Sequence, residues 1–168
     1  SGLGWAHVLL VNHPGEQAAA ALAVSPRDGS VHCVWTDDQQ GHRDVYYGHM
    51  EAMSTRGLTR IVVNDDGGAA AQSTPVLALG QNPRGGENIY ISWVDDRYRQ
   101  GSEDTDLFYA EVRAGSVSTN VLVGDDGTNS HQAQPDLIVD AHGQPVLLWS
   151  DRREGRGGIY GAGVTHIR

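Results

Sequence analysis

One residue pattern occurs three times in this chain and constrains its fold more than any other feature. In each copy an apolar run ends in Trp-x-Asp or its close equivalent, a polar loop follows, and a second apolar run carries aromatic residues. The three tryptophans, Trp35, Trp93 and Trp149, are spaced 58 and 56 residues apart. Repeats of this length are typical of proteins whose neighbouring units bury each other's apolar faces. The sequence therefore predicts three copies of one structural unit.

Each copy contains four short runs of β-prone residues separated by turn signals. In the third copy these runs lie at 120–123, 134–139, 145–149 and 159–164, with glycine-containing turns between the first three. The alanine run Ala18 to Ala21 would favour a helix by itself, but it aligns with the second run of the other copies. We therefore predict a strand there, and an all-β chain without helix.

Composition restricts the partners more than it identifies them. The formal net charge of −9 argues against nucleic acid and against an anionic membrane surface, because both need a basic protein face. No apolar stretch approaches the length of a membrane span, and the first residues lack the pattern of a signal peptide. The single cysteine, Cys33, excludes an internal disulfide and is expected to be buried.

Four short antiparallel strands, repeated, are the plan of a β-propeller in which each unit is one blade. A solenoid is the structural alternative. We divide the single repeat domain, residues 1–168, into a blade-ending strand at 7–12, repeat one at 17–63, repeat two at 72–123 and repeat three at 132–168.

The order of the strands predicts how such a ring would close. The first strand lacks a blade and the last blade lacks its fourth strand, so the two would complete each other in a closed ring. Three blades are too few for a ring, but two chains would supply six. We therefore expect half of a six-bladed propeller that closes as a homodimer by exchanging this strand. A fragment of a longer chain and a monomeric three-blade solenoid are the alternatives.

The repeated pattern of an apolar run, Trp-x-Asp, an Arg- and Gly-containing loop and Asp-apolar-Tyr resembles the sialidase-like propeller repeats of bacterial proteins. The resemblance covers essentially the whole chain and implies blades and an extracellular or periplasmic location. The family's Asp-box, Ser-x-Asp-x-Gly-x-x-Trp, is missing, because the chain continues after Tyr46-Tyr47 with Met50 to Ser54. Sialidase chemistry would also need an arginine cluster and a tyrosine nucleophile, for which Arg97, Arg153 and Tyr98 are too few.

One face of the predicted propeller gathers two families of polar loops, and a channel mouth there is the natural place for a small polar ligand. The expected ligand-binding residues are Gln17, Gln72, Gln132, His131, Arg97 and Arg153. Residues present in every copy are interpreted instead as structural: Trp35, Trp93, Trp149, Asp37, Asp95 and Asp151. Trp5 lies outside the repeat, and the pattern assigns it no role.

The loop of the second copy is the longest and the most acidic of the three. Clustered carboxylates supply the oxygen ligands that Ca²⁺ prefers, although a solvated acidic loop is the favoured interpretation. The candidate Ca²⁺ ligands are Asp95, Asp96, Glu103, Asp104 and Asp106. No other cofactor is expected.

No catalytic residue is singled out, because the chain has no HExxH motif, nucleophile elbow or phosphate-binding loop. The leading hypothesis is therefore a non-catalytic binding module, for a glycan or another small polar ligand, that uses the polar loop face. A sialidase-like glycoside hydrolase is the second hypothesis. A purely structural or engineered assembly unit is the third.

Overall fold

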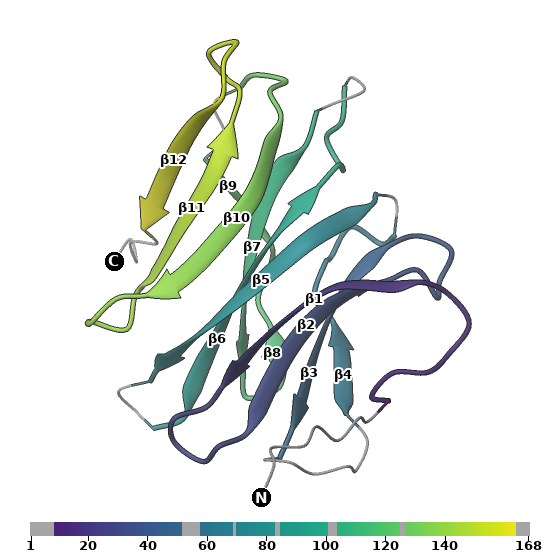
Figure 1. The fold of residues 1–168 in the computed structure, drawn as a ribbon, viewed down its shortest axis with the longest axis vertical. Helices are drawn as coiled ribbons and strands as arrows, with labels where there is room; N and C mark the ends of the chain where they lie inside the picture. Colours follow the sequence, from purple (N-terminus) through teal and green to yellow (C-terminus); the bar gives the residue numbers. More distant parts are fainter. Residues whose placement is uncertain are drawn as a thin grey trace, which may run out of the picture.

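The computed structural model describes residues 9–51, 58–68, 70–82, 85–100, 104–124 and 127–163, and every regular element among them is a β-strand. The strands form three antiparallel sheets that fan out side by side (Figure 1). Sheet 1 consists of β1 (Gln17–Val24), β2 (Val31–Asp37), β3 (Asp44–Met50) and β4 (Thr59–Val62). Sheet 2 consists of β5 (Gln72–Gln81), β6 (Glu87–Asp95), β7 (Asp106–Arg113), β8 (Ser116–Val117) and β9 (Val121–Val123). Sheet 3 consists of β10 (Gln132–Val139), β11 (Pro145–Asp151) and β12 (Gly158–Gly163).

The repeated sequence pattern gives the three sheets one common register. The aromatic pairs across the second and third strands are Trp35–Tyr46, Trp93–Phe108 and Trp149–Tyr160. Their ring centroids lie 5.8, 6.2 and 6.3 Å apart in stacked geometry. Because the register is shared, each residue of one sheet has a definite counterpart in the other two. The alanine run lies in β1, as the alignment predicts.

The innermost strand of each sheet carries the same β-bulge. The register of each shifts at a non-glycine residue with positive φ: Ala19 at 50°, Thr74 at 45° and Gln134 at 53°. Such bulges bend a strand and increase its twist. Because the bulge recurs at equivalent positions, we attribute it to the geometry of the repeat rather than to one functional site.

Two apolar layers hold the sheets together, and sheet 2 takes part in both. The layer between sheets 1 and 2 is centred on residues such as Val34, Ile91 and Trp93, and the layer between sheets 2 and 3 on Leu107 and Trp149. The inner strand β5 lies between β1 and β10. Each tryptophan of sheets 2 and 3 therefore packs against the preceding sheet, and sheets 1 and 3 lie on opposite sides of sheet 2.

The strand expected over residues 7–12 does not form within the described part of that segment. Residues 7 and 8 lie outside the described residues, and residues 9–12 belong to no strand. The physical reason is that the sheet edge which this strand was expected to complete lies out of its reach in the same chain. That edge is β12 of sheet 3, on the far side of sheet 2. The short strand β8 was not expected from the sequence.

The described residues contain no helix long and apolar enough to cross a membrane.

Candidate functional site

The aspartates of the repeated pattern lie at the ends of β2, β6 and β11 and are almost completely buried. The indole Nε1 of each tryptophan donates to the aspartate two residues later: Trp35 to Asp37 at 3.4 Å, Trp93 to Asp95 at 2.9 Å and Trp149 to Asp151 at 3.1 Å. The second carboxylate oxygen accepts the backbone N–H two residues further on, at 2.8–3.0 Å. Each carboxylate thus joins the indole to the following turn, which gives it a structural role.

A basic side chain lies beside each buried carboxylate, but its type and its position in the chain differ between the sheets. Arg97 Nη2 lies 2.8 Å from Asp95, and Arg153 Nε lies 2.9 Å from Asp151. The two guanidinium groups also cover aromatic rings, Phe108 at 3.9 Å and Tyr160 at 4.2 Å from the ring centroids. Both arginines also contact the loop that follows the preceding sheet: Arg97 pairs with Asp65 at 2.8 Å, and Arg153 Nη2 donates to Gly124 O at 3.1 Å.

In sheet 1 the corresponding position is Gln39, and His13 takes the place of the arginine. Its Nε2 lies 2.8 Å from Asp37 Oδ2, at an angle outside hydrogen-bond geometry, so the contact is an ion pair only when the imidazole is protonated. His13 belongs to the segment that precedes β1. This contact therefore attaches that segment to sheet 1.

The glutamines that precede each inner strand lie in different environments. Gln72 and Gln132 are buried. Gln132 Oε1 accepts the backbone N–H of Leu107, 3.1 Å away in the preceding sheet, and Gln72 Nε2 donates to Asp95 at 3.2 Å. Gln17 is exposed, and its amide contacts Gly15 O at 3.0 Å. Two of the three glutamines therefore belong to the packing between strands and do not face solvent.

The remaining residues predicted for the polar loops are dispersed. His131 Nδ1 lies 2.7 Å from Thr105 Oγ1, on the loop before β10. Of the candidate Ca²⁺ ligands, Asp95 is engaged as described, Asp96 accepts from Ala71 N at 2.6 Å and Asp104 accepts from Gln100 N at 2.9 Å. Asp106 begins β7, and Glu103, like Trp5, lies outside the described residues. Within the described ranges, no group of three or more His, Cys, Asp or Glu residues has a geometry suited to a metal ion.

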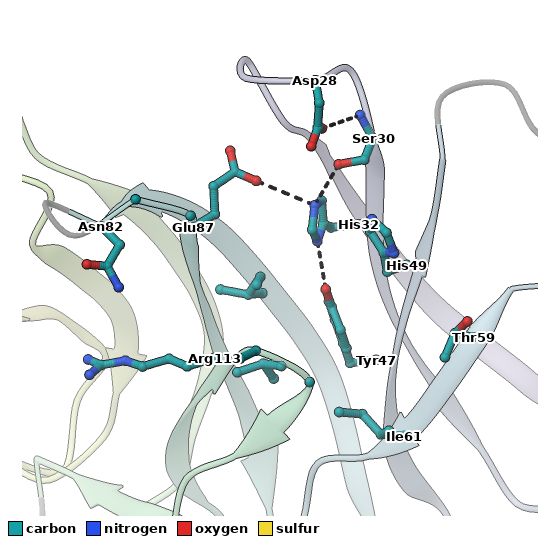
Figure 2. A pocket seen from close by; sticks show the side chains of 16 residues that line it. Asp28, Ser30, His32, Tyr47, His49, Thr59, Ile61, Asn82, Glu87 and Arg113 are labelled. Atoms are coloured by element: carbon teal, nitrogen blue, oxygen red, sulfur yellow. Dashed lines mark hydrogen bonds and ion pairs between the residues drawn. The ribbon is translucent and has the colours of Figure 1, made fainter.

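A cleft of about 500 Å³ opens between sheets 1 and 2, at the end of the strands opposite the Trp-x-Asp turns (Figure 2). It is lined by the beginnings of β2, β4 and β6 and by the ends of β3 and β7. Ile61, Ile89 and Val112 give it apolar walls. Polar side chains form its floor and its rim. The cleft therefore combines an apolar surface with convergent polar groups, as ligand sites do.

The floor of the cleft is a chain of hydrogen bonds through His32. The imidazole Nδ1 lies 2.7 Å from Tyr47 Oη, and Nε2 lies 3.1 Å from Ser30 Oγ and 3.7 Å from Glu87 Oε2. Ser25 Oγ donates to the other Glu87 oxygen at 2.8 Å. Figure 2 shows His32 projecting between Glu87 and Tyr47, which come from neighbouring sheets. The network therefore exists only because the two sheets pack together.

Burial sets the protonation states of this floor. It lowers the pKa of His32 below the ordinary value of 6.5, and the neighbouring His49 lowers it further, while Glu87 and Asp28 act in the opposite direction. Burial raises the pKa of Tyr47 well above the usual range of a phenol, and the nearby Cys33 and Glu87 add to this effect. At neutral pH the floor thus presents a neutral imidazole and a protonated phenol.

The rim is more open and carries charge. Asp28 is exposed on the β1–β2 turn and accepts from Ser30 N at 3.0 Å. Hydrogen bonds from the Ser30 side chain and backbone lower the Asp28 pKa to about 2. His49, Thr59, Asn82 and Arg113 complete the rim. An ionised carboxylate therefore faces the mouth of the cleft throughout the physiological pH range.

Comparison with known proteins gives one informative result. No family model matches the chain, and neither does any curated protein. Among solved structures the chain is similar to the endo-arabinase from Bacteroides thetaiotaomicron VPI-5482, with a TM-score of 0.55 and 10% sequence identity. The match covers 93% of this chain and 58% of that one. The two chains share a fold. The likeness supports a propeller-like arrangement of the three sheets, and the chain spans little more than half the length of that enzyme.

Sequence reasoning placed the candidate site at the other end of the strands and missed the cleft. A signal for it does exist in the repeat itself. The counterparts of His32 are Tyr90 and Val146, so a histidine stands here where the other copies have a phenol and an aliphatic side chain. Its partner Glu87 is far away in the sequence, however, and only the packing of sheet 2 on sheet 1 brings the two together.

Proposed function

We propose that the chain is a propeller module that binds a neutral oligosaccharide without catalysing its cleavage, and that the ligand lies in the cleft between sheets 1 and 2. The observation that carries the proposal is the combination of apolar walls with a hydrogen-bonding floor and rim. Sugars present hydroxyl groups that both donate and accept, together with apolar C–H faces. Ile61 and Ile89 suit those faces, and Asp28 and His49 suit the hydroxyl groups.

The protonation states favour binding over catalysis. A tyrosine nucleophile of the sialidase-like kind would need an easily ionised phenol, whereas Tyr47 holds its proton more firmly than usual. A general acid would need a carboxyl group protonated near neutral pH, and the pKa of Asp28 is about 2. Both groups are suited to hydrogen bonding in a fixed state.

A glycoside hydrolase is the alternative function, and two observations favour it. The structural neighbour is an endo-arabinase, and two carboxylates, Asp28 and Glu87, line the same cleft. Arabino-oligosaccharides are therefore the first ligands to test, followed by a glycan array of neutral oligosaccharides. Release of reducing ends from arabinan that is abolished by Glu87→Gln would establish the hydrolase instead of the binding module.

The binding site can be located with two matched variants. Asp28→Asn removes the rim charge while keeping its shape, and Glu154→Gln makes the equivalent change on the exposed turn between β11 and β12. We expect calorimetric titration with the best oligosaccharide to show at least about tenfold weaker binding for Asp28→Asn, as loss of a charge-assisted hydrogen bond predicts, and unchanged binding for Glu154→Gln.

Two results would contradict the proposal. Absence of binding to every oligosaccharide would favour a purely structural unit. Binding that is unaffected by Asp28→Asn and His49→Gln but lost in Arg153→Gln would move the site to the polar loop face predicted from the sequence.

We also propose that the three sheets are half of a six-bladed ring completed by a second copy of the chain. The shared register of the sheets and the exposed apolar side chains on the outer faces of sheets 1 and 3 support this closure. Measuring the mass of the 18.0 kDa chain by light scattering tests it.

A further inference from the structure

We infer that residues 9–11 of one chain form the fourth strand of sheet 3 in a second copy, pairing Leu9 with Gly161, Leu10 with Tyr160 and Val11 with Ile159. The inference rests on the proposed six-bladed closure, and not on the ligand cleft. Residues 9–11 form no strand in the single chain, and the inference gives them a specific partner strand and a specific register.

The register follows from the fourth strands that are present. In sheet 1, Tyr46 pairs with Val62 and Tyr47 with Ile61, while in sheet 2 Phe108 pairs with Leu122 and Tyr109 with Val121. Sheet 3 offers Tyr160 and Gly161 at the same positions of β12. The segment Leu9-Leu10-Val11-Asn12 matches Ile61-Val62-Val63-Asn64 in apolar character and in the final asparagine. The same pairing therefore places Leu10 opposite Tyr160.

The edge of sheet 3 is exposed where the other sheets are covered. Ile159 is 75% exposed, whereas its counterparts Val45 and Leu107 are both 0% exposed. Two further apolar side chains on the same outer face, Ile138 and Leu148, are exposed as well. An unpaired edge next to an exposed apolar face favours association with another strand and sheet.

The opposite end of the molecule carries the complementary surface. Leu22 on β1 is 70% exposed, while its counterparts Leu77 and Leu137 are buried at 8% and 6% by the preceding sheet. Leu10, which lines the same surface hollow as Leu22, is exposed as well. The exposed face of sheet 1 is therefore the one that sheets 2 and 3 pack against the sheet before them. The exposed face of sheet 3 corresponds to the one on which the next sheet packs.

Polar groups support the same arrangement. The backbone N–H of Val45 donates to Asn64 Oδ1 at 2.9 Å, and that of Leu107 donates to Gln132 Oε1 at 3.1 Å. The N–H of Ile159 faces the free edge in the common register. The counterparts of the two acceptors are Asn12 and the exposed Gln17, so a second copy brings both to Ile159.

A second copy is the proposed occupant because this chain itself carries both complementary surfaces, the exposed face of sheet 1 and the open edge of sheet 3. Sheet 2 separates residues 9–11 from β12 of the same chain (Figure 1). Two copies related by a two-fold axis bring each segment to the other's β12 and close six sheets into a ring, which lies within the usual range of propellers. Additional blades on a longer chain are the competing occupant.

Cysteine pairs test the register directly. In a Cys33→Ala background, chains carrying Val11→Cys are mixed with chains carrying Ile159→Cys and oxidised with copper phenanthroline to form a disulfide, because the proposed pairing would bury both thiols as Val63 and Val45 are buried. Both positions are solvent-accessible, so both variants should fold. We expect light scattering to give twice the 18.0 kDa chain mass and about half of the protein, the statistical share of mixed dimers, to be cross-linked. A control pair, Tyr98→Cys with Ile159→Cys, should remain uncross-linked, because Tyr98 lies on an exposed loop of sheet 2.

The outcomes separate this inference from the closure on which it rests. A dimer that Val11→Cys and Ile159→Cys fail to cross-link would overturn the strand exchange but leave the six-bladed ring. A monomer that persists at high concentration would overturn both and favour further blades on a longer chain. Neither result bears on oligosaccharide binding in the cleft.

Discussion

Trp93 and Asp95, two residues apart on β6, are both completely buried and are joined by a 2.9 Å hydrogen bond from the indole Nε1 to Oδ2. Arg97 contacts the same oxygen at 2.8 Å and stacks on Phe108, the partner of the indole across the sheet. One carboxylate thus joins a tryptophan, a turn and a guanidinium group in the apolar layer between sheets 1 and 2.

Asp95→Asn is expected to be destabilising, because it removes the buried one of the two carboxylates that contact the mostly buried Arg97 guanidinium, Asp65 being the other. Breaking a buried ion pair in this way costs about 3 kcal/mol of unfolding free energy. Urea denaturation followed by tryptophan fluorescence measures the loss. Asp96→Asn is the matched control, since Asp96 is more exposed and asparagine keeps its oxygen, and a change within about 0.5 kcal/mol is expected. Equal effects of the two substitutions would refute the structural role of Asp95.

The pairing of His13 with Asp37 predicts a rescue. His13→Leu leaves the buried Asp37 without the imidazole 2.8 Å away and should lower the unfolding free energy by about 1–2 kcal/mol. Gln39 stands where the other sheets have arginine, so adding Gln39→Arg to His13→Leu should restore most of the loss. The exposed Arg60, which lies over the Tyr46 ring, can move aside. A double variant as unstable as His13→Leu alone would show that the sheets do not share this arrangement.

The sheets were predictable from the sequence because strand pairing is locally encoded. Alternating apolar runs, glycine turns and three repetitions of one pattern are enough to place β2, β3 and their counterparts. The alanine-rich β1 was predictable only through the repeat. The strand expected at 7–12 does not form at residues 9–12 of the single chain, because a strand needs an edge to pair with and nothing in a local pattern says where that edge lies.

The candidate site was not predictable for a related reason. Gln72 and Gln132 are polar residues that recur before inner strands, which is typical of a ligand-binding loop, yet Gln132 satisfies a backbone N–H of the preceding sheet. His32 is a lone histidine in an apolar run, a pattern usually typical of a core residue. His32 becomes a candidate site residue through its contact with Glu87, which the packing of the two sheets brings within 3.7 Å.

Gly124 and Gly127 test the contact between the loop after β9 and Trp149. Both have positive φ, 67° and 68°, so alanine at either position strains the backbone by about 1 kcal/mol. A Cβ at Gly124 would also lie 2.7 Å from Trp149 Cζ2, whereas a Cβ at Gly127 would meet nothing. We expect Gly124→Ala to be the more destabilising by at least about 1 kcal/mol in urea denaturation, because the indole cannot move without disturbing Asp151. Equal losses would mean that the indole has room to move.

The buried His32 makes stability depend on pH. Burial, followed by the charge of His49, lowers its pKa in the folded chain below the ordinary 6.5, so the unfolded chain binds the proton more readily. Its contribution to stability is therefore fully present above pH 6.5 and is lost as the pH falls from 6.5 toward the folded pKa.

We expect the urea midpoint to decrease as the pH is lowered from 7.5 to 5. His32→Gln keeps a donor and an acceptor for Tyr47 and Ser30 but cannot titrate in this range, so its midpoint should vary less. His142→Gln, on the exposed turn before β11, should keep the wild-type dependence. A His32→Gln profile as steep as that of the wild type would assign the pH dependence to other groups.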